Sequence, residues 1–172
     1  MNRLRWSALA TIVALFTADR VTKLWIEGHL TLYDSYPAIP GIFNIVHTQN
    51  PGAAFGLFAT ATPTVRFLVL IAASFAMMAI IGQMLWQATA RANAASPVFR
   101  TALALVLGGA IGNLYDRLLY ERVTDFLQVF LGTYEWPSFN VADSAICVGA
   151  TLLAIDMLWG RAREGTAART AS

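Results

Sequence analysis

Apolar residues gather in four long stretches that are separated by more polar segments. The stretches cover residues 6–26, 67–86, 101–119 and 141–159. Each is close to the length of about 20 residues that an α-helix needs to cross a bilayer. The pattern therefore predicts a membrane α-helical protein with four transmembrane helices.

The positions of proline and tryptophan support the same division. All six prolines lie outside the four stretches, as expected because proline breaks or kinks a helix interior. All five tryptophans lie at or just beyond the ends of stretches. An indole at headgroup depth keeps its ring in an apolar layer and its N–H in water, so these positions mark the two membrane surfaces.

The two longer connections carry further predictions. Residues 27–66 are long for a loop, and within them residues 30–36 and 41–48 are rich in β-branched and aromatic residues. This composition is typical of short strands, so we expect a small extracytoplasmic β-sheet cradle there. Residues 120–139 contain Tyr134 and Trp136, which suit an interfacial segment between the third and fourth helices.

Basic residues predict the orientation, because loops rich in lysine and arginine face the cytoplasm. Seven of the twelve lie before the first helix, between the second and third, or after the fourth: Arg3, Arg5, Arg91, Arg100, Arg161, Arg163 and Arg169. Four spans place these three regions on one side. We therefore expect both termini in the cytoplasm, with residues 161–172 as a cytoplasmic tail.

Composition agrees with a single membrane domain over residues 1–172. The chain is 57% hydrophobic and 13% charged, against about 25% charged in an average soluble domain. Its net charge is only +2 and its basic residues are scattered, so nucleic acid is not indicated as a partner. Cys147 is the single cysteine, which excludes an intrachain disulfide and a cysteine-based metal cluster.

Polar residues from three predicted helices meet at the outer end of the bundle. They are Asp19, Arg20, Lys23, Asn113, Asp116, Arg117, Asn140 and Asp143, and Asp125 lies in the outer connection. Charged groups are costly within a membrane and are functional candidates by default. This outer cluster is therefore the predicted site.

Some members of the cluster also have structural interpretations. Asp19 and Lys23 are spaced for an i,i+4 ion pair. Asp116 and Arg117 could neutralise or orient each other at the end of their helix. Asp143 has no cation nearby in the sequence, which makes it the residue least easily explained as structural.

Asp125 and Asp143 are the best candidates for chemistry. Two carboxyl groups brought close together share a proton, so one can activate water while the other donates a proton to a carbonyl oxygen. Neither a His-Glu-x-x-His zinc motif nor a Gly-x-Ser-x-Gly elbow is present. A small transporter or channel with a polar outer vestibule and a non-catalytic assembly factor remain alternatives.

Five motifs in order along the chain resemble those of the lipoprotein signal peptidases. This family of type II signal peptidases consists of aspartic peptidases of bacterial membranes. The motifs are Asp19–Lys23, Asn50–Gly56, Gly108–Arg117, Val123–Phe126 and Phe139–Asp143. The resemblance covers most of the chain and implies an aspartic endopeptidase.

The resemblance also implies roles for individual residues. Asp125 and Asp143 would be the catalytic dyad. The residues that line the site or hold the substrate would be Asn50, Gly52, Asn113, Arg117 and Asn140. The residues that support the fold and the site would be Asp19, Lys23 and Asp116. Neither a metal nor another cofactor is implied.

By the same resemblance, the substrates are prolipoproteins whose cysteine carries diacylglycerol, and cleavage falls just before that cysteine. The enzyme would lie in the bacterial cytoplasmic (inner) membrane among its lipids, with its active site toward the outer face, and globomycin-type peptides would inhibit it. The sheet and residues 120–139 would form a cradle and a lid around the substrate. Gly108, Gly109 and Gly112 would let another helix or the signal peptide approach closely.

Overall fold

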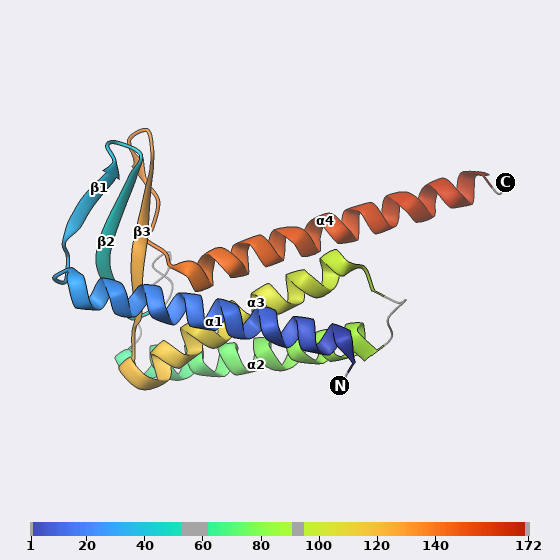
Figure 1. Ribbon diagram of the computed structural model, residues 1–172, viewed down its shortest axis with the longest axis horizontal. Helices are drawn as coiled ribbons and strands as arrows, with labels where there is room; N and C mark the ends of the chain where they lie inside the picture. Colours follow the sequence, from blue (N-terminus) through green and yellow to red (C-terminus); the bar gives the residue numbers. More distant parts are fainter. Residues whose placement is uncertain (1, 53–61, 91–94, 171–172) are drawn as a thin grey trace.

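Four helices lie side by side, and an antiparallel sheet stands at one end of them (Figure 1). The computed structural model describes residues 2–52, 62–90 and 95–170, with side chains as far as Trp159. The helices are α1 (Arg3–His29), α2 (Pro63–Ala90), α3 (Pro97–Tyr120) and α4 (Val141–Thr170). The strands are β1 (Ser35–Ile39), β2 (Phe43–Asn50), β3 (Val123–Leu131) and β4 (Tyr134–Glu135).

The helices extend beyond the apolar stretches that predicted them. Pro63 and Pro97 are the first residues of α2 and α3, a position where the missing N–H leaves no helical hydrogen bond unmade. The side chain of Ser96 caps α3 by accepting a hydrogen bond from the N–H of Phe99, at 2.9 Å. α4 continues to Thr170, so most of the expected tail is a helical extension past the other helices (Figure 1).

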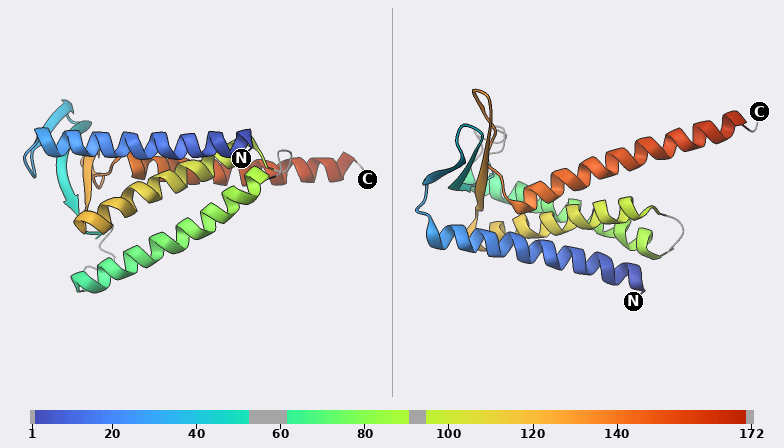
Figure 2. Two further views of the ribbon diagram at one scale, coloured as in Figure 1. Left: turned by 60° about the horizontal axis from the view of Figure 1, so that its bottom comes forward. Right: turned by 45° about the horizontal axis from the view of Figure 1, so that its top comes forward.

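Three helical segments are long and apolar enough to cross a membrane: Pro63–Ala90, Pro97–Tyr120 and Val141–Trp159. α3 contacts the other three helices, and eleven of its residues are buried. In contrast, α2 buries only Leu85, Ala88 and Thr89. The described core of the bundle is therefore built around α3, while α2 lies at one side of the bundle (Figure 2) and most of its residues are exposed or half-buried.

Glycines allow α3 to approach its neighbours. A Cβ on Gly108 would meet Leu15 of α1, whereas a Cβ on Gly109 would meet the main chain of Ala142 in α4. Gly112 likewise faces the side chain of Ala142. These glycines were expected to let either another helix or the signal peptide approach closely. The structure shows the close approach of other helices.

The sheet differs from its prediction in two respects. Its first strand, expected at residues 30–36, is β1 at Ser35–Ile39 and shares only residues 35 and 36 with that prediction. Its strand order is β1-β2-β3-β4, and all three pairings are antiparallel. The expected interfacial segment 120–139 therefore supplies two strands of the same sheet, with Asp125 of β3 opposite Thr48 of β2. β1 is an edge strand, which explains how it tolerates Pro37.

The sheet lies where α1 and α3 end and where α2 and α4 begin (Figures 1 and 2). β3 follows α3 after a two-residue connection, and α4 begins soon after β4. Residues from the ends of several helices therefore lie next to the base of β3.

We expect the Gly109→Ala substitution to destabilise the packing of α3 against α4. Overpacking costs about 1–3 kcal/mol, which exceeds the gain of about 1 kcal/mol from replacing a helical glycine by alanine. The test is the melting temperature of the purified protein in detergent. Gly82→Ala is the matched control, because a Cβ at this position in α2 would meet open space. A Gly109→Ala protein that melts no lower than the control would contradict the close packing.

Candidate active site

Asp125 lies on β3 and is 3% exposed. Its carboxylate accepts hydrogen bonds from the side-chain amides of Asn140, at 2.7 Å, and Asn50, at 3.2 Å. Its main-chain carbonyl accepts a third from the hydroxyl of Thr48, at 3.0 Å. β2 and the residue before α4 therefore hold Asp125 from two sides.

Asp143 lies in the first turn of α4 and belongs to a reciprocal capping pair. Its N–H donates to Oδ1 of Asn140, at 2.9 Å, and its Oδ2 accepts from the N–H of Asn140, at 3.2 Å. Such a pair satisfies N–H groups that a helix start leaves without a partner. Nδ2 of Asn113 donates to the other carboxylate oxygen, at 2.7 Å. These contacts fix both oxygens of Asp143, and the helix N-terminus favours its negative charge.

Asn140 connects the two carboxylates. It is fully buried, and it contacts Asp125 through its side chain and Asp143 through both its side chain and its N–H. Burial, followed by the nearby charge of Asp143, raises the pKa of Asp125 to about 7, while hydrogen bonds from Asn50 and Asn140 oppose the rise. The two acids that the sequence singled out are therefore brought together and interact electrostatically.

A buried ion-pair network lies next to this pair. Nζ of Lys23 lies 2.7 Å from Asp19 and 2.6 Å from Asp116, and the Asp116 carboxylate also binds Arg20, at 2.5 Å. Nζ of Lys23 donates in addition to Oδ1 of Asn113, at 3.3 Å. The network therefore joins α1 to α3 and reaches the amide that holds Asp143.

Asp19 extends this network to α4. Its second carboxylate oxygen accepts a hydrogen bond from the N–H of Ala142, at 3.0 Å. The expected pair of Asp19 and Lys23 is confirmed. Three helices are thus tied together at the end where the acids meet.

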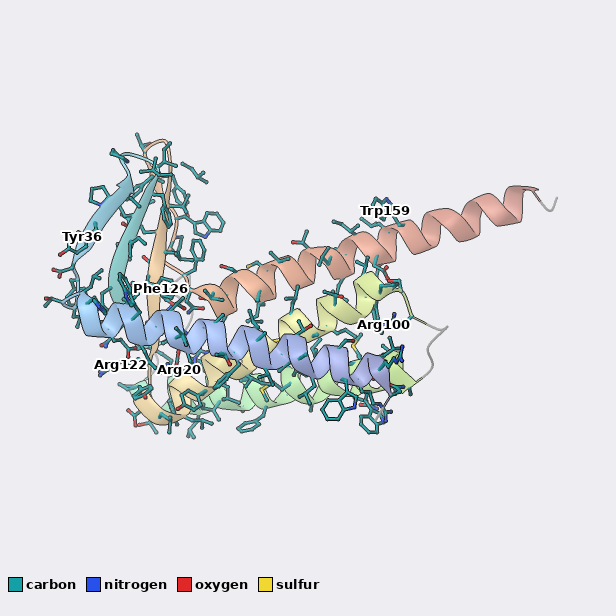
Figure 3. All side chains as sticks on the ribbon, in the orientation of Figure 1. Arg20, Tyr36, Arg100, Arg122, Phe126 and Trp159 are labelled. Carbon is teal, nitrogen blue, oxygen red and sulfur yellow. The ribbon has the colours of Figure 1, made fainter. Side chains whose placement is uncertain are left out.

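The expected pairing of Asp116 with Arg117 is wrong. Asp116 binds Arg20 and Lys23 instead, and Arg117 donates to the main-chain carbonyl of Asn113, at 3.3 Å. Neighbouring residues on a helix do not face each other, which explains the difference. Arg20 belongs to the predicted outer cluster but had no expected partner, and the structure pairs it with Asp116. Arg20 lies at the sheet end of the bundle in Figure 3.

Gly52 supports Asn50. Its N–H donates to Oδ1 of Asn50, at 2.8 Å, which leaves the amide nitrogen of Asn50 to contact Asp125. Gly52 adopts a φ of +93°, a conformation that glycine accepts readily, and it packs against Leu70 of α2. The remaining residues of this motif, 53–56, lie outside the described residues.

The distribution of buried polar residues does not favour a transport path. Among the described residues, nearly all buried polar side chains lie toward the sheet end, and only Thr89 lies toward the other end. Within the same ranges, no group of three or more His, Cys, Asp or Glu side chains could hold a metal ion.

A bundle of apolar helices with a cluster of charged side chains at its sheet end is typical of a membrane protein, and comparison with known proteins assigns its family. The family described as signal peptidase (SPase) II matches residues 11–159. The chain is 44% identical to the lipoprotein signal peptidase of Solibacter usitatus, over 92% of this chain and 94% of that one. It is 41% identical to the lipoprotein signal peptidase of Geobacter sulfurreducens, over 87% and 89%. The chain belongs to the signal peptidase II family and is a protease.

Solved structures agree with this assignment. One structure of a bacterial membrane enzyme has a TM-score of 0.78 and 27% identity, covering 91% of this chain and 90% of that one. Another has a TM-score of 0.72 and 29% identity, covering 89% and 93%. The helical membrane fold with its small antiparallel sheet is therefore shared with known membrane enzymes.

We expect Lys23→Met to destabilise the bundle strongly, because Asp19 would lose its ion-pair partner and Asp116 one of two. Removing one partner of a buried ion pair costs about 3–5 kcal/mol. The double variant Lys23→Met/Asp19→Asn removes the stranded charge and should recover part of the loss. Thermal unfolding in detergent measures both effects. A double variant that melts no higher than Lys23→Met would contradict this account of the network.

Proposed function

We propose that Asp125 and Asp143 are the catalytic dyad with which this protease removes signal peptides from prolipoproteins. The observation that carries the proposal is a pair of interacting carboxylates, Asp125 buried and Asp143 half-buried, each oriented by asparagine amides. A pair that shares one proton supplies an acid and a base at the same time. Because the chain belongs to the signal peptidase II family, the reaction is hydrolysis of a peptide bond.

The raised pKa of Asp125 supports a proposal for the two roles. Near neutral pH, Asp125 retains the shared proton in part of the population, whereas Asp143 sits among donors that stabilise its negative charge. Asp143 takes a proton from water, whose oxygen attacks the scissile carbonyl carbon, and Asp125 donates its proton to the carbonyl oxygen. When the C–N bond breaks, Asp143 returns its proton to the leaving nitrogen, and Asp125 regains one from the gem-diol.

The substrate is proposed to be a prolipoprotein cleaved just before a cysteine that carries diacylglycerol. The lipid would lie among the acyl chains of the membrane, and the scissile bond would lie at headgroup depth beside the first turn of α4. Asn50, Gly52 and Arg117 would hold the substrate main chain near the dyad. The sheet formed by β1–β4 would cradle the substrate, and globomycin-type peptides would compete for the same place.

All four helices are proposed to span the bacterial inner membrane as one domain, residues 1–172. α1 carries more charge than the other three, but Asp19, Arg20 and Lys23 are buried against the bundle and need not contact lipid. Its 27 residues give a length of about 40 Å at 1.5 Å per residue, which is sufficient to cross. The excess of basic residues at the end opposite the sheet supports cytoplasmic termini and an outward-facing site.

Asp125→Asn and Asp143→Asn are each expected to reduce cleavage by more than about 100-fold, because each removes one of the two proton-transfer groups. The measurement is in-vitro cleavage of a diacylglyceryl-modified prolipoprotein by the purified protein, with and without globomycin. The double variant should be no slower than the slower single variant, since the two acids act as one unit.

The matched control is Asp34→Asn, which replaces a carboxylate that bonds the N–H of Thr31 in the loop before β1. It should cleave at nearly the rate of the wild type. Near-native cleavage by either dyad variant would remove that residue from the proposed mechanism.

The pH profile tests the role of Asp125 as the acid. Since its pKa is about 7, kcat/KM should fall as pH rises through about 7, where the donated proton is lost. Asn50→Ala removes a hydrogen bond that lowers this pKa, so the alkaline limb should move to higher pH even as the rate decreases. Asn44→Ala is the control, because Asn44 also lies on β2 but bonds Ser35 and Gln128. An unmoved limb in Asn50→Ala would exclude Asp125 as the titrating acid.

A further inference from the structure

A groove of about 240 Å³ lies between α1 and α2, toward the end of the bundle opposite the sheet. We refer to it as the α1–α2 groove. Its lining residues are Arg5, Ala8, Leu9 and Ile12 of α1, and Gly82, Leu85, Trp86 and Thr89 of α2. Each set has the spacing i, i+3, i+4, i+7, which places its members on one face of a helix. The groove is therefore formed by two facing helical stripes.

Only one end of the α1–α2 groove is charged. The guanidinium carbon of Arg5 lies 3.6 Å from the centre of a Trp86 ring, a cation–π contact that holds the cation at this end of the groove. Nε of Arg5 is buried and has no hydrogen-bond partner among the described residues. Thr89 adds little polarity, because its hydroxyl donates to the carbonyl of Leu85 within its own helix, at 2.7 Å.

The position of the groove along the bundle matches a membrane surface. Trp6 and Trp86 are 59% and 61% exposed near its charged end, and exposed tryptophans favour the headgroup layer. Ile12 lies seven residues along α1 from Arg5, which is about 10 Å deeper at 1.5 Å per residue. The groove therefore begins with a cation at headgroup depth and continues as an apolar channel into the acyl layer.

We propose that the α1–α2 groove binds an anionic phospholipid. The phosphate lies on the Arg5 guanidinium, whose planar array of donors suits phosphate oxygens, and the upper part of one acyl chain lies between the two stripes. This site is at the opposite end of the bundle from Asp125 and Asp143, so it goes beyond the proposed catalysis; it rests only on the proposed membrane span of α1.

The test is native mass spectrometry of the full-length protein in detergent, titrated with phosphatidylglycerol and, separately, with phosphatidylcholine. The wild type should bind phosphatidylglycerol more tightly. Arg5→Gln should weaken that binding about fivefold, which is the contribution of one basic residue near anionic lipid. Gly82→Leu should weaken the binding of both lipids, because no atom lies within 4 Å of a Cβ at Gly82 and the larger side chain would fill the groove.

Arg3→Gln is the matched charge control, because Arg3 is exposed and does not line the groove. It should bind phosphatidylglycerol as the wild type does. Equal losses in Arg3→Gln and Arg5→Gln would overturn the proposal, since only general charge would then matter.

Two further results would also overturn the proposal. One is undiminished lipid binding by a Gly82→Leu protein whose melting temperature equals that of the wild type. The other is displacement of the lipid by inorganic phosphate at a similar concentration, which would show a phosphate site without an acyl groove. If Gly82→Leu does not fold, Leu9→Trp, which enlarges an exposed lining residue of the opposite stripe, is judged by the same criterion.

Discussion

The burial of Lys23 between two aspartates is the constraint on which the rest of the structure depends. An ammonium group removed from water is costly unless opposite charges and hydrogen-bond acceptors surround it. Asp19, Asp116 and Asn113 meet that requirement from α1 and α3. Because these partners come from two helices, the requirement also fixes how far α1 can slide or rotate against α3.

The position of Lys23 also determines which way the side-chain amide of Asn113 is oriented. Oδ1 of Asn113 accepts from Lys23, so its nitrogen is the group that faces Asp143. Asn140 behaves in the same way, because its Oδ1 accepts from the N–H of Asp143 and its nitrogen then faces Asp125. An amide has one acceptor and one donor side, so each ion pair or helix cap sets the orientation of a donor toward an acid. The supporting charges therefore orient the proposed dyad without contacting it.

Sequence patterns predicted the parts of the structure that local chemistry determines. Apolar length and the spacing of Asp19 and Lys23 are local features, and the helices and that ion pair followed from them. The partner of Asp116 and the strand at residues 123–131 depend on segments far apart in the chain, so their patterns did not reveal them. The motifs indicated that Asp125 and Asp143 belong together. The amide contacts that join them depend on the folded arrangement of β3 and α4, which the sequence pattern does not reveal.

Asp143 lies on a helix and Asp125 lies on a strand, so the distance between the two acids depends on how the sheet is attached to the bundle. Asp143 is fixed within α4, whereas Asp125 is fixed on β3 by pairing with β2. Thr124, the neighbour of Asp125, donates to Glu27 at the end of α1, at 2.6 Å, and its carbonyl accepts from Asn140, at 3.4 Å. These two bonds attach β3 to the bundle on both sides of the site. The separation of the acids is therefore set by how firmly the sheet is held at the ends of α1 and α4, and not by either element alone.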